Sequence, residues 1–195
     1  MARIRFVAGV LVGAVALRVL TGPGVVNYDT LYSLVWGRQL AEGTAPDLEA
    51  GIAPTPHPLA TLGGIVLSPL SLFEHEGLHG EPATAVVLAF AFVSLALVGW
   101  IVFALGREWF NPAAGALAAA IVVTRVPVLD FGARAYMDIP FLALVLGALL
   151  VETRRPRAGG PVLALLALAG LVRPEAWLFS AVYLVWLLAP GMRRG

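Results

Sequence analysis

The chain has 195 residues, of which 59% are hydrophobic and 13% are charged, and its formal net charge is +1. Soluble domains carry about 25% charged residues, so this composition excludes a soluble enzyme, a disordered chain and a nucleic-acid-binding protein. It indicates an all-α integral membrane protein. Because the sequence has no cysteine, disulfides and thiolate metal sites are excluded, and a metal would need His, Asp or Glu ligands.

The first apolar run covers residues 4–21 and is preceded by Arg3 and Arg5. A helix needs about 20 residues, at 1.5 Å each, to cross roughly 30 Å of hydrocarbon, so this run is close to spanning length. Residues 21–24 lack the small-x-small pattern of a signal-peptide cleavage site. We therefore interpret the run as a retained first span with its N-terminus in the cytoplasm.

Residues 22–82 follow and are predicted to form an extracytoplasmic loop. Within this loop, residues 29–42 have the apolar spacing of an amphipathic helix at the membrane interface, and the next residue, a glycine, would end it. Residues 59–73 are apolar but reach only about 22 Å, which predicts a re-entrant or interfacial helix that does not cross. His75 and His79 are predicted to lie in a solvated linker after it.

The remainder of the chain predicts the other spans of a bundle with about six transmembrane helices. The apolar runs that predict them are 83–105, 113–129, 139–151, 161–172 and 176–189. The tripeptide Arg173-Pro174-Glu175 separates the last two runs. We expect residues 1–195 to form a single membrane domain.

The arginines determine the expected orientation, because loops rich in basic residues stay in the cytoplasm. If residues 59–73 do not cross, Arg107 and the cluster at 154–157 share the cytoplasmic side with the N-terminus. The opposite side then holds every acidic residue except Glu108 and Glu152. We expect a multi-pass protein of the plasma (cytoplasmic) membrane whose active face is extracytoplasmic.

Asp29, soon after the first span, is the first candidate catalytic residue, and Tyr28 beside it is a candidate substrate-binding residue. The alternative role for Asp29 is to cap the helix at 29–42, and a capping carboxylate can still face a substrate. His57 lies between two prolines, which restrict its backbone. Its imidazole is either an ordinary loop side chain or a ligand for a phosphate or a metal.

Charged residues gather again between and after the later spans. Asp130, Arg134 and Asp138 lie within nine residues, and Asp138 also fits a helix start. Ionisable groups at membrane depth normally face each other or a protein cavity. Arg173 and Glu175 are either an internal ion pair or a site in which the planar guanidinium binds an anionic headgroup such as a phosphate.

The order of these features resembles the N-terminal module of the polytopic C-type glycosyltransferases, which include the protein O-mannosyltransferases and the lipid A aminoarabinose transferases. An acidic residue follows the first span, a His-Pro-Leu begins a short apolar helix, an Arg-x-x-x-Asp follows a later span, and a Leu-Val-Arg-Pro-Glu comes near the end. The resemblance covers residues 3–189. It implies transfer of a sugar from a polyprenyl-phosphate donor outside the cytoplasm, generally with inversion.

The resemblance also implies a role for each candidate residue. Asp29 looks like the acidic residue of the first outer loop, which is the candidate general base. Asp138, the second candidate catalytic residue, resembles a second acidic position that helps to hold a metal or the donor. A divalent metal ion at Asp138 is therefore the cofactor that the resemblance suggests. The expected residues for binding the donor phosphate or the substrate are Tyr28, His57, Arg134, Arg173 and Glu175.

Three functions are compatible with these features. The first is sugar transfer to an acceptor hydroxyl, in which Asp29 takes the proton and the cations stabilise the leaving phosphate. The second is a non-catalytic module that binds a lipid-linked sugar or a partner enzyme, and the third, ranked last, is a small transporter. The expected partners are the lipid bilayer, the polyprenyl-phosphate-linked sugar and a second membrane subunit, with no nucleic acid. Because complete members of the group have more helices, we expect a short or incomplete version of a larger transferase.

Overall fold

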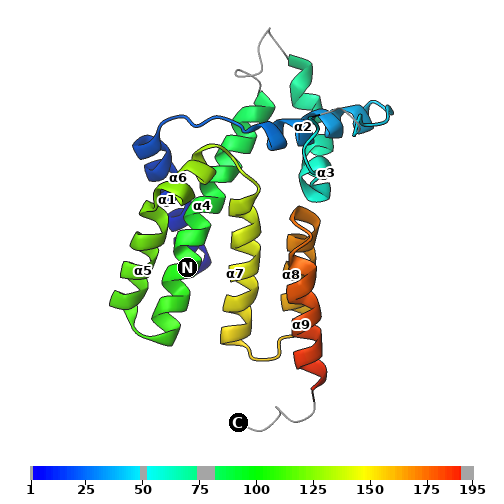
Figure 1. Ribbon diagram of the computed structural model, residues 1–195. Helices are drawn as coiled ribbons and strands as arrows, with labels where there is room; N and C mark the ends of the chain where they lie inside the picture. The colour runs from blue at the N-terminus through cyan, green and yellow to red at the C-terminus, as the bar shows by residue number, and fades with distance from the viewer. Residues whose placement is uncertain (1, 49–51, 74–81, 190–195) are drawn as a thin grey trace.

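The computed structural model describes residues 2–48, 52–73 and 82–189, and all regular secondary structure in these ranges is helical (Figure 1). The predicted linker with His75 and His79 lies outside them. The helices are α1 (Ala2–Thr21), α2 (Tyr28–Ala41), α3 (Pro58–Leu67), the 3-10 helix η1 (Ser68–Phe73), α4 (Pro82–Trp109), α5 (Pro112–Thr124), α6 (Val126–Ala133), α7 (Asp138–Arg154), α8 (Gly160–Val172) and α9 (Ala176–Leu188).

Helix length decides which elements can cross a membrane alone. Among the described residues, α1 and the 28-residue α4 are long and apolar enough, and the bent pair of α5 and α6 would count as a third span. Helices α8 and α9 are apolar but have 13 residues each, so each measures about 20 Å. The all-α fold and apolar helices of a membrane protein are thus confirmed, whereas six spans stay a prediction.

The prediction of one continuous span over 113–129 is wrong, because the helix breaks at Arg125. Helix α5 ends one residue before it, and α6 leaves at a bend of 63°. Arg125 has an extended backbone, with φ −67° and ψ 126°. Pro127 in the first turn of α6 has no N–H with which to continue the hydrogen bonds of α5. The charged side chain and the proline together end the first helix inside an apolar run.

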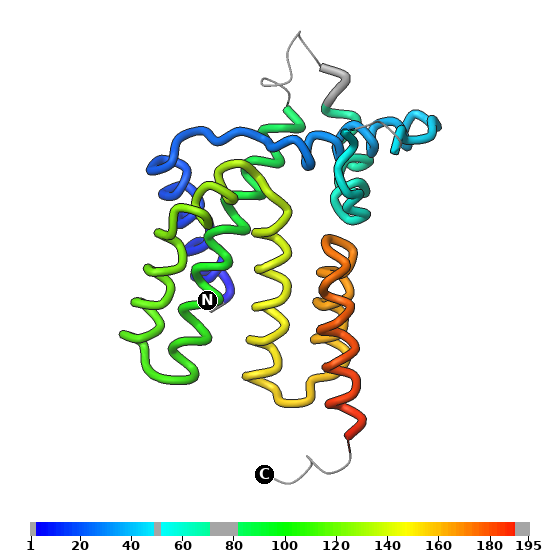
Figure 2. Tube along the Cα trace, viewed as in Figure 1, coloured from blue at the N-terminus to red at the C-terminus, as the bar shows by residue number. Residues whose placement is uncertain are grey.

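Helix α4 is the centre of the bundle and packs against α1, α5, α6 and α7. Helix α8 packs against α7, and α9 packs against α8, so these helices follow one another side by side (Figure 2). The buried core between α4 and α7 consists of apolar side chains at helical spacing. It contains Leu95, Val98, Ile101, Ala104 and Leu105 of α4 and Ile139, Ala143 and Leu150 of α7.

Helices α2 and α3 lie together at one end of the bundle, and α2 runs across the direction of the other helices (Figure 1). The buried residues of α2 are Thr30, Ser33, Trp36 and Gly37. Its apolar residues Val35 and Leu40 are each 44% exposed. The face that contacts protein thus combines the large Trp36 ring with three small residues. Val35 and Leu40 remain open to the surroundings, as apolar side chains do in a helix at a membrane interface.

The contact between α2 and α3 predicts that Gly64→Ala destabilises the protein and that Gly63→Ala does not. A Cβ on Gly64 would lie 2.5 Å from the carbonyl oxygen of Ser33, whereas a Cβ on Gly63 would meet no atom within 4 Å. Both changes raise the helix propensity of α3 by about 1 kcal/mol, so their difference isolates the overpacking cost of about 1–3 kcal/mol. Thermal unfolding in detergent measures it, and equal melting temperatures would contradict the close helix contact.

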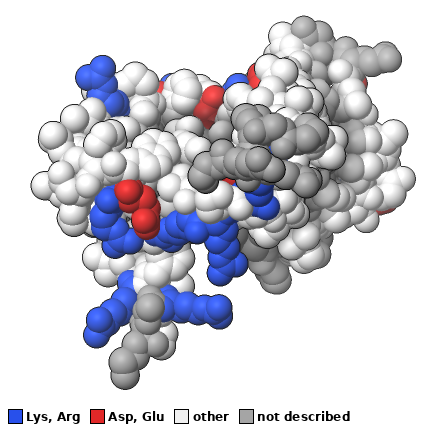
Figure 3. All heavy atoms as spheres, turned by 90° about the horizontal axis from the view of Figure 1, so that it is seen from below, with Lys and Arg blue, Asp and Glu red and all other residues white. Residues whose placement is uncertain are grey.

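Arginines gather at the other end of the bundle, on the face shown in Figure 3. There Arg154 pairs with Glu108 at 3.1 Å and joins the ends of α7 and α4. Glu152 accepts hydrogen bonds from the backbone N–H of Arg157 at 2.5 Å and from the Tyr183 hydroxyl at 2.6 Å. These bonds fix the short turn between α7 and α8 and connect it to α9. The placement of this end in the cytoplasm stays a prediction.

Candidate active site

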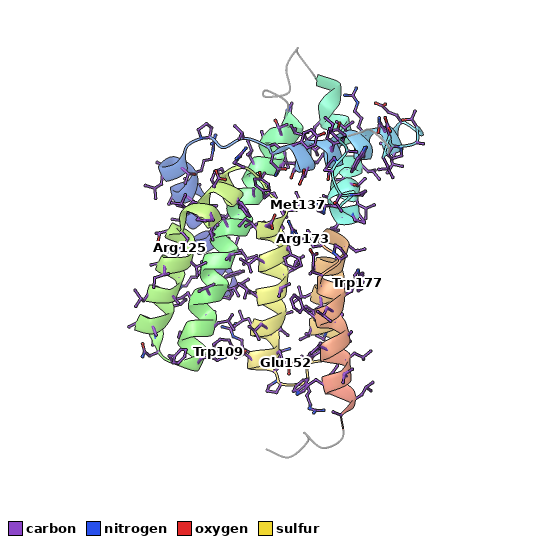
Figure 4. The ribbon with its side chains drawn as sticks, viewed as in Figure 1. Trp109, Arg125, Met137, Glu152, Arg173 and Trp177 are labelled. Atoms are coloured by element: carbon purple, nitrogen blue, oxygen red, sulfur yellow. The ribbon has the colours of Figure 1, made fainter. Side chains whose placement is uncertain are left out.

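Asp138 and Arg173 form an ion pair where two neighbouring helices end. Asp138 is the first residue of α7, and Arg173 directly follows α8. The Nη2 atom of Arg173 lies 2.8 Å from both carboxylate oxygens of Asp138. The side chains are 34% exposed for Arg173 and 28% for Asp138, so the pair is half-buried. Figure 4 shows Arg173 next to Met137 at the corresponding ends of α8 and α7.

The local sequence explains why Arg173 leaves the helix at this point. Pro174 cannot continue α8, and Arg173 adopts an extended backbone with φ −142° and ψ 130°. Helix α9 returns directly along α8. Gly170 permits this return, because a Cβ there would lie 2.6 Å from the ring of Trp177. The predicted break between the last two apolar runs is therefore confirmed as a tight turn that carries Arg173.

Asp138 begins α7, as its sequence position predicts, but it does not cap the helix, because Met137 takes the N-cap position and there is no side-chain capping bond. The Asp138 carboxylate binds Arg173 instead. Glu175 is more distant, with 4.0 Å between its Oε1 and Nη1 of Arg173, and its side chain is 62% exposed. The close partner of Arg173 is therefore an aspartate on another helix. The Nε atom of Arg173 is buried and has no hydrogen-bond partner within the described ranges.

His57 connects the start of α3 to the end of α8. It is 7% exposed, and its Nδ1 lies 2.7 Å from the carbonyl oxygen of Val172. A carbonyl only accepts hydrogen bonds, so Nδ1 carries the proton and Nε2 is the nitrogen that can serve another partner. Because Val172 directly precedes Arg173, this bond places His57 beside the backbone of the residue that pairs with Asp138.

This arrangement predicts that His57→Ala lowers the stability by about 1–3 kcal/mol, because the buried carbonyl of Val172 loses its donor. In His57→Asn, the side-chain amide takes a position near that of Nδ1 and can still donate, so we expect a smaller loss. Thermal unfolding of the two variants in detergent compares them. Equal losses would show that the bond between α3 and α8 contributes nothing measurable.

Asp29 lies in the first turn of α2 but does not cap it. The cap is Asn27, whose Oδ1 accepts a hydrogen bond from the N–H of Thr30 at 3.1 Å. Within the described part of the chain, no hydrogen bond or ion pair engages the Asp29 carboxylate, and the residue is partly exposed. The capping alternative is therefore wrong. A negative charge in the first turn is favourable beside the N-terminal end of the helix dipole.

Tyr28 makes a hydrogen bond to the segment between α2 and α3 and not to the Asp138–Arg173 pair. Its hydroxyl donates a hydrogen bond to the carbonyl oxygen of Ile52 at 2.6 Å. Hydrogen bonding with the Tyr32 side chain is the main cause that raises the pKa of Tyr28 to about 12. The phenol therefore stays protonated at physiological pH, so that it can donate a hydrogen bond but cannot act as a base.

The Arg134 side chain also lies apart from the ion pair. Its Nη1 is 3.7 Å from Oδ2 of Asp130, and its guanidinium lies 5.8 Å from the centre of the Tyr136 ring. Both members of the Arg134–Asp130 pair are 49% exposed. The structure thus brings together His57, Asp138 and Arg173 but gives Arg134 a different partner.

Two residues near Asp29 make contacts that the sequence does not predict. Asn27 and Thr30 are 6% and 2% exposed. The Nδ2 of Asn27 donates to the carbonyl oxygen of Arg134 at 3.0 Å, and the Thr30 hydroxyl donates to that of Ala135 at 2.8 Å. An asparagine before a helix indicates a cap, but no local pattern reveals partners more than 100 residues away. These bonds place the start of α2 against the turn between α6 and α7.

The residues around Asp138 do not fit a divalent metal well. Within the ranges that the structure describes, no three His, Asp or Glu side chains are grouped so that they could hold a metal ion. Both oxygens of Asp138 face Arg173, so a metal at this carboxylate would have to displace the guanidinium.

A family model described as dolichyl-phosphate-mannose-protein mannosyltransferase matches residues 76–195. This match covers more than half of the chain. It includes Arg134, Asp138, Arg173 and Glu175, whereas the candidates on α2 and at the start of α3 precede it. No curated protein and no solved structure shows significant similarity to the chain.

Proposed function

Because the chain belongs to the dolichyl-phosphate-mannose-protein mannosyltransferase family, we propose that it transfers a sugar from a polyprenyl-phosphate-linked donor to an acceptor hydroxyl. The reaction takes place at the extracytoplasmic face of the cytoplasmic membrane and inverts the anomeric centre. The observation that carries this proposal is the convergence of His57, Asp138 and Arg173 from three separate segments. The arginine-rich opposite end supports the orientation, since basic loops stay in the cytoplasm.

Arg173 is the group proposed to bind the donor phosphate. A guanidinium has five N–H donors, and Asp138 engages those of Nη2 alone, so other donors remain for phosphate oxygens. The negative charge of Asp138 holds the guanidinium in a fixed orientation. Charge that develops on the leaving phosphate is then stabilised without reorganisation of the site.

His57 is proposed to contribute a second contact with the same phosphate. Its Nδ1 already donates to the Val172 carbonyl, so Nε2 can donate to a phosphate only as the imidazolium, in which both ring nitrogens carry a proton. A bound phosphate favours that charged form because opposite charges attract. Because His57 lies at the start of α3, a bound donor phosphate would also contact the end of this helix.

Asp29 is proposed to be the general base. The acceptor oxygen attacks the anomeric carbon, its proton passes to the Asp29 carboxylate, and the bond from the anomeric carbon to the phosphate oxygen breaks. The electron pair of that bond stays on the phosphate, so the products are a glycoside, polyprenyl phosphate and a protonated Asp29 that returns its proton to water. A carboxylate with no other partner in the described chain is suited to this step.

The test is a transfer assay on the chain in liposomes. Polyprenyl-phosphate mannose and a hydroxyl acceptor are supplied, and the release of polyprenyl phosphate is measured. We expect release that depends on the acceptor and a product of inverted configuration. A folded chain that binds the donor but releases no polyprenyl phosphate would overturn the proposal of catalysis.

That outcome would favour a second function, in which the chain binds the lipid-linked sugar for a partner membrane subunit without reacting. One observation speaks for it. Two of the residues in this region, His57 and Arg173, are expected to bind phosphate, whereas no hydrogen bond or ion pair links the described Asp29 side chain to them. Co-purification of the donor lipid with a second membrane protein would support this alternative.

A further inference from the structure

The turn between α6 and α7 contains a residue in an unfavourable backbone conformation. Ala135 has φ +51° and is 2% exposed. Residues with a Cβ rarely adopt the left-handed region, because the Cβ approaches the following carbonyl oxygen. Ala135 precedes Asp138 by three residues, so its conformation determines where α7 and the Asp138 carboxylate begin. Two bonds within the turn support it, from the Ala135 N–H to the Gly132 carbonyl at 3.1 Å and from the Tyr136 N–H to the Phe131 carbonyl at 2.9 Å. Contacts from elsewhere in the chain add to them.

These contacts come from residues 24–30, which we call the strap. Gly24 begins it with φ +77°, and a Cβ there would collide with the carbonyl oxygen of Ala133. The strap then donates hydrogen bonds to three consecutive carbonyl groups at the end of α6, where a helix has no partners of its own. The bonds run from the Val25 N–H to Ala133 at 2.9 Å, from the N–H and Nδ2 of Asn27 to Arg134 at 2.9 and 3.0 Å, and from the Thr30 hydroxyl to Ala135 at 2.8 Å.

The two side chains of the strap that make these bonds lie on either side of Asp29. Asn27 precedes it by two residues, and Thr30 follows it directly. Their bonds to Arg134 and Ala135 therefore fix the backbone of Asp29 and the backbone that leads to Asp138 relative to each other. Because both side chains are almost fully buried, a lost bond is not replaced by water without local rearrangement.

We infer that Asn27 and Thr30 are positioning residues. Together with the local bonds of the turn, they hold Ala135 in its left-handed conformation, and so they fix the position of Asp29 relative to the Asp138–Arg173 pair. They act through the backbone and contact neither ion-pair side chain through a hydrogen bond among the described residues. The expected effect of these residues on sugar transfer rests on the proposed function. Their expected effect on the conformation of the turn between α6 and α7 is independent of it.

The test compares variants of two buried hydroxyls on the same face of α2. Thr30→Val keeps the side-chain shape but removes the donor to Ala135, and Thr30→Ser keeps the donor. Ser33→Ala is the matched control, because Ser33 is 1% exposed and its hydroxyl donates to the Asp29 carbonyl of its own helix at 3.1 Å. Ala135→Gly is the rescuing change, since glycine adopts the left-handed region without a steric cost.

The geometric readout is maleimide labelling of Met137→Cys, which places one cysteine in a chain that has none. We expect Thr30→Val to raise the labelling rate about tenfold, as loss of a buried hydrogen bond shifts a local opening equilibrium by roughly that factor. Thr30→Ser and Ser33→Ala should label like the parent chain. Ala135→Gly should restore slow labelling to Thr30→Val, whereas Gly63→Ala, a stabilising change elsewhere, should not.

Sugar transfer by the same variants without the cysteine is the second readout. We expect Thr30→Val to lower transfer about tenfold and Ala135→Gly to restore most of it. Labelling and transfer of Thr30→Val at the parent level would overturn the inference. A labelling response in a parent chain that transfers no sugar would support the strap and overturn the proposed function, so the two failures are distinguishable.

Discussion

We expect Arg173→Gln to weaken binding of a polyprenyl-phosphate donor about a hundredfold. Hydrogen bonds to charged groups contribute about 1.5–3 kcal/mol, and each 1.4 kcal/mol is about tenfold in affinity. Glutamine keeps a polar side chain but removes the positive charge and most of the donors. The measurement is binding of labelled donor lipid to the purified chain. Arg173→Lys retains the charge without the planar fork and should bind with intermediate affinity.

The same change also has a structural effect that must be separated from binding. Without Arg173, the Asp138 carboxylate is left half-buried and unpaired, at a cost of about 1–2 kcal/mol that lies between the values for exposed and buried pairs. In the double variant Arg173→Gln with Asp138→Asn, the stranded charge is absent and thermal stability should recover. Donor binding should not recover. A double variant that regains both would mean that Arg173 serves only the fold.

Asp29→Asn is expected to lower transfer by about 10²–10⁴-fold, which is the usual contribution of a positioned general base. Donor binding should stay near its original level, since the side chain is not among the groups proposed to bind phosphate. Folding should also persist, because the cap of α2 is Asn27 and the lost interaction of Asp29 with the helix dipole contributes only about 0.3–1 kcal/mol. The assay measures release of polyprenyl phosphate under saturating donor.

Glu42→Gln is the matched control for this variant. It removes a carboxylate at the opposite end of the same helix, where Glu42 pairs with Arg38 at 2.9 Å on an exposed surface. We expect its transfer rate to equal that of the parent chain. Normal transfer by Asp29→Asn would show that Asp29 is not the base. An equal loss in both variants would indicate that the total negative charge of the loop, and not Asp29 itself, supports transfer.

Local features of the sequence were sufficient to predict most helices. Apolar runs of 18 or more residues predicted α1 and α4, a glycine marked the end of α2, and a proline marked the boundary between α8 and α9. The single helix predicted over 59–73 is divided into α3 and the 3-10 helix η1, because Pro69 interrupts the α-helical hydrogen bonds. The tripeptide at 173–175 was recognised as a break because a proline there removes a hydrogen bond within an otherwise continuous run. These features depend on residues within one or two turns of each other.

Features that depend on distant partners were not predicted. Arg125 lies within an apolar run, so hydropathy did not reveal the bend after α5. Asp138 and Arg173 were identified as candidates, but their pairing and the bond from His57 to α8 join segments that are 35 and 115 residues apart. Thr30 was not predicted, because the role of its hydroxyl depends on a hydrogen bond to Ala135, which is distant in the sequence. Side-chain chemistry therefore indicated the candidate residues, whereas only the tertiary structure shows which of them are in contact.

If Arg173 binds the donor phosphate as proposed, the short α8–α9 hairpin determines how deep in the membrane the two meet. Helices α8 and α9 have 13 residues each and are therefore about 20 Å long, whereas the hydrocarbon layer is roughly 30 Å thick. If α8 starts at one boundary of this layer, the turn between α8 and α9 lies about 10 Å from the opposite boundary. A donor phosphate would then descend below the headgroup plane before it met the guanidinium. At that depth the dielectric constant is low and mobile ions are scarce, so the attraction would be strong and nearly independent of ionic strength.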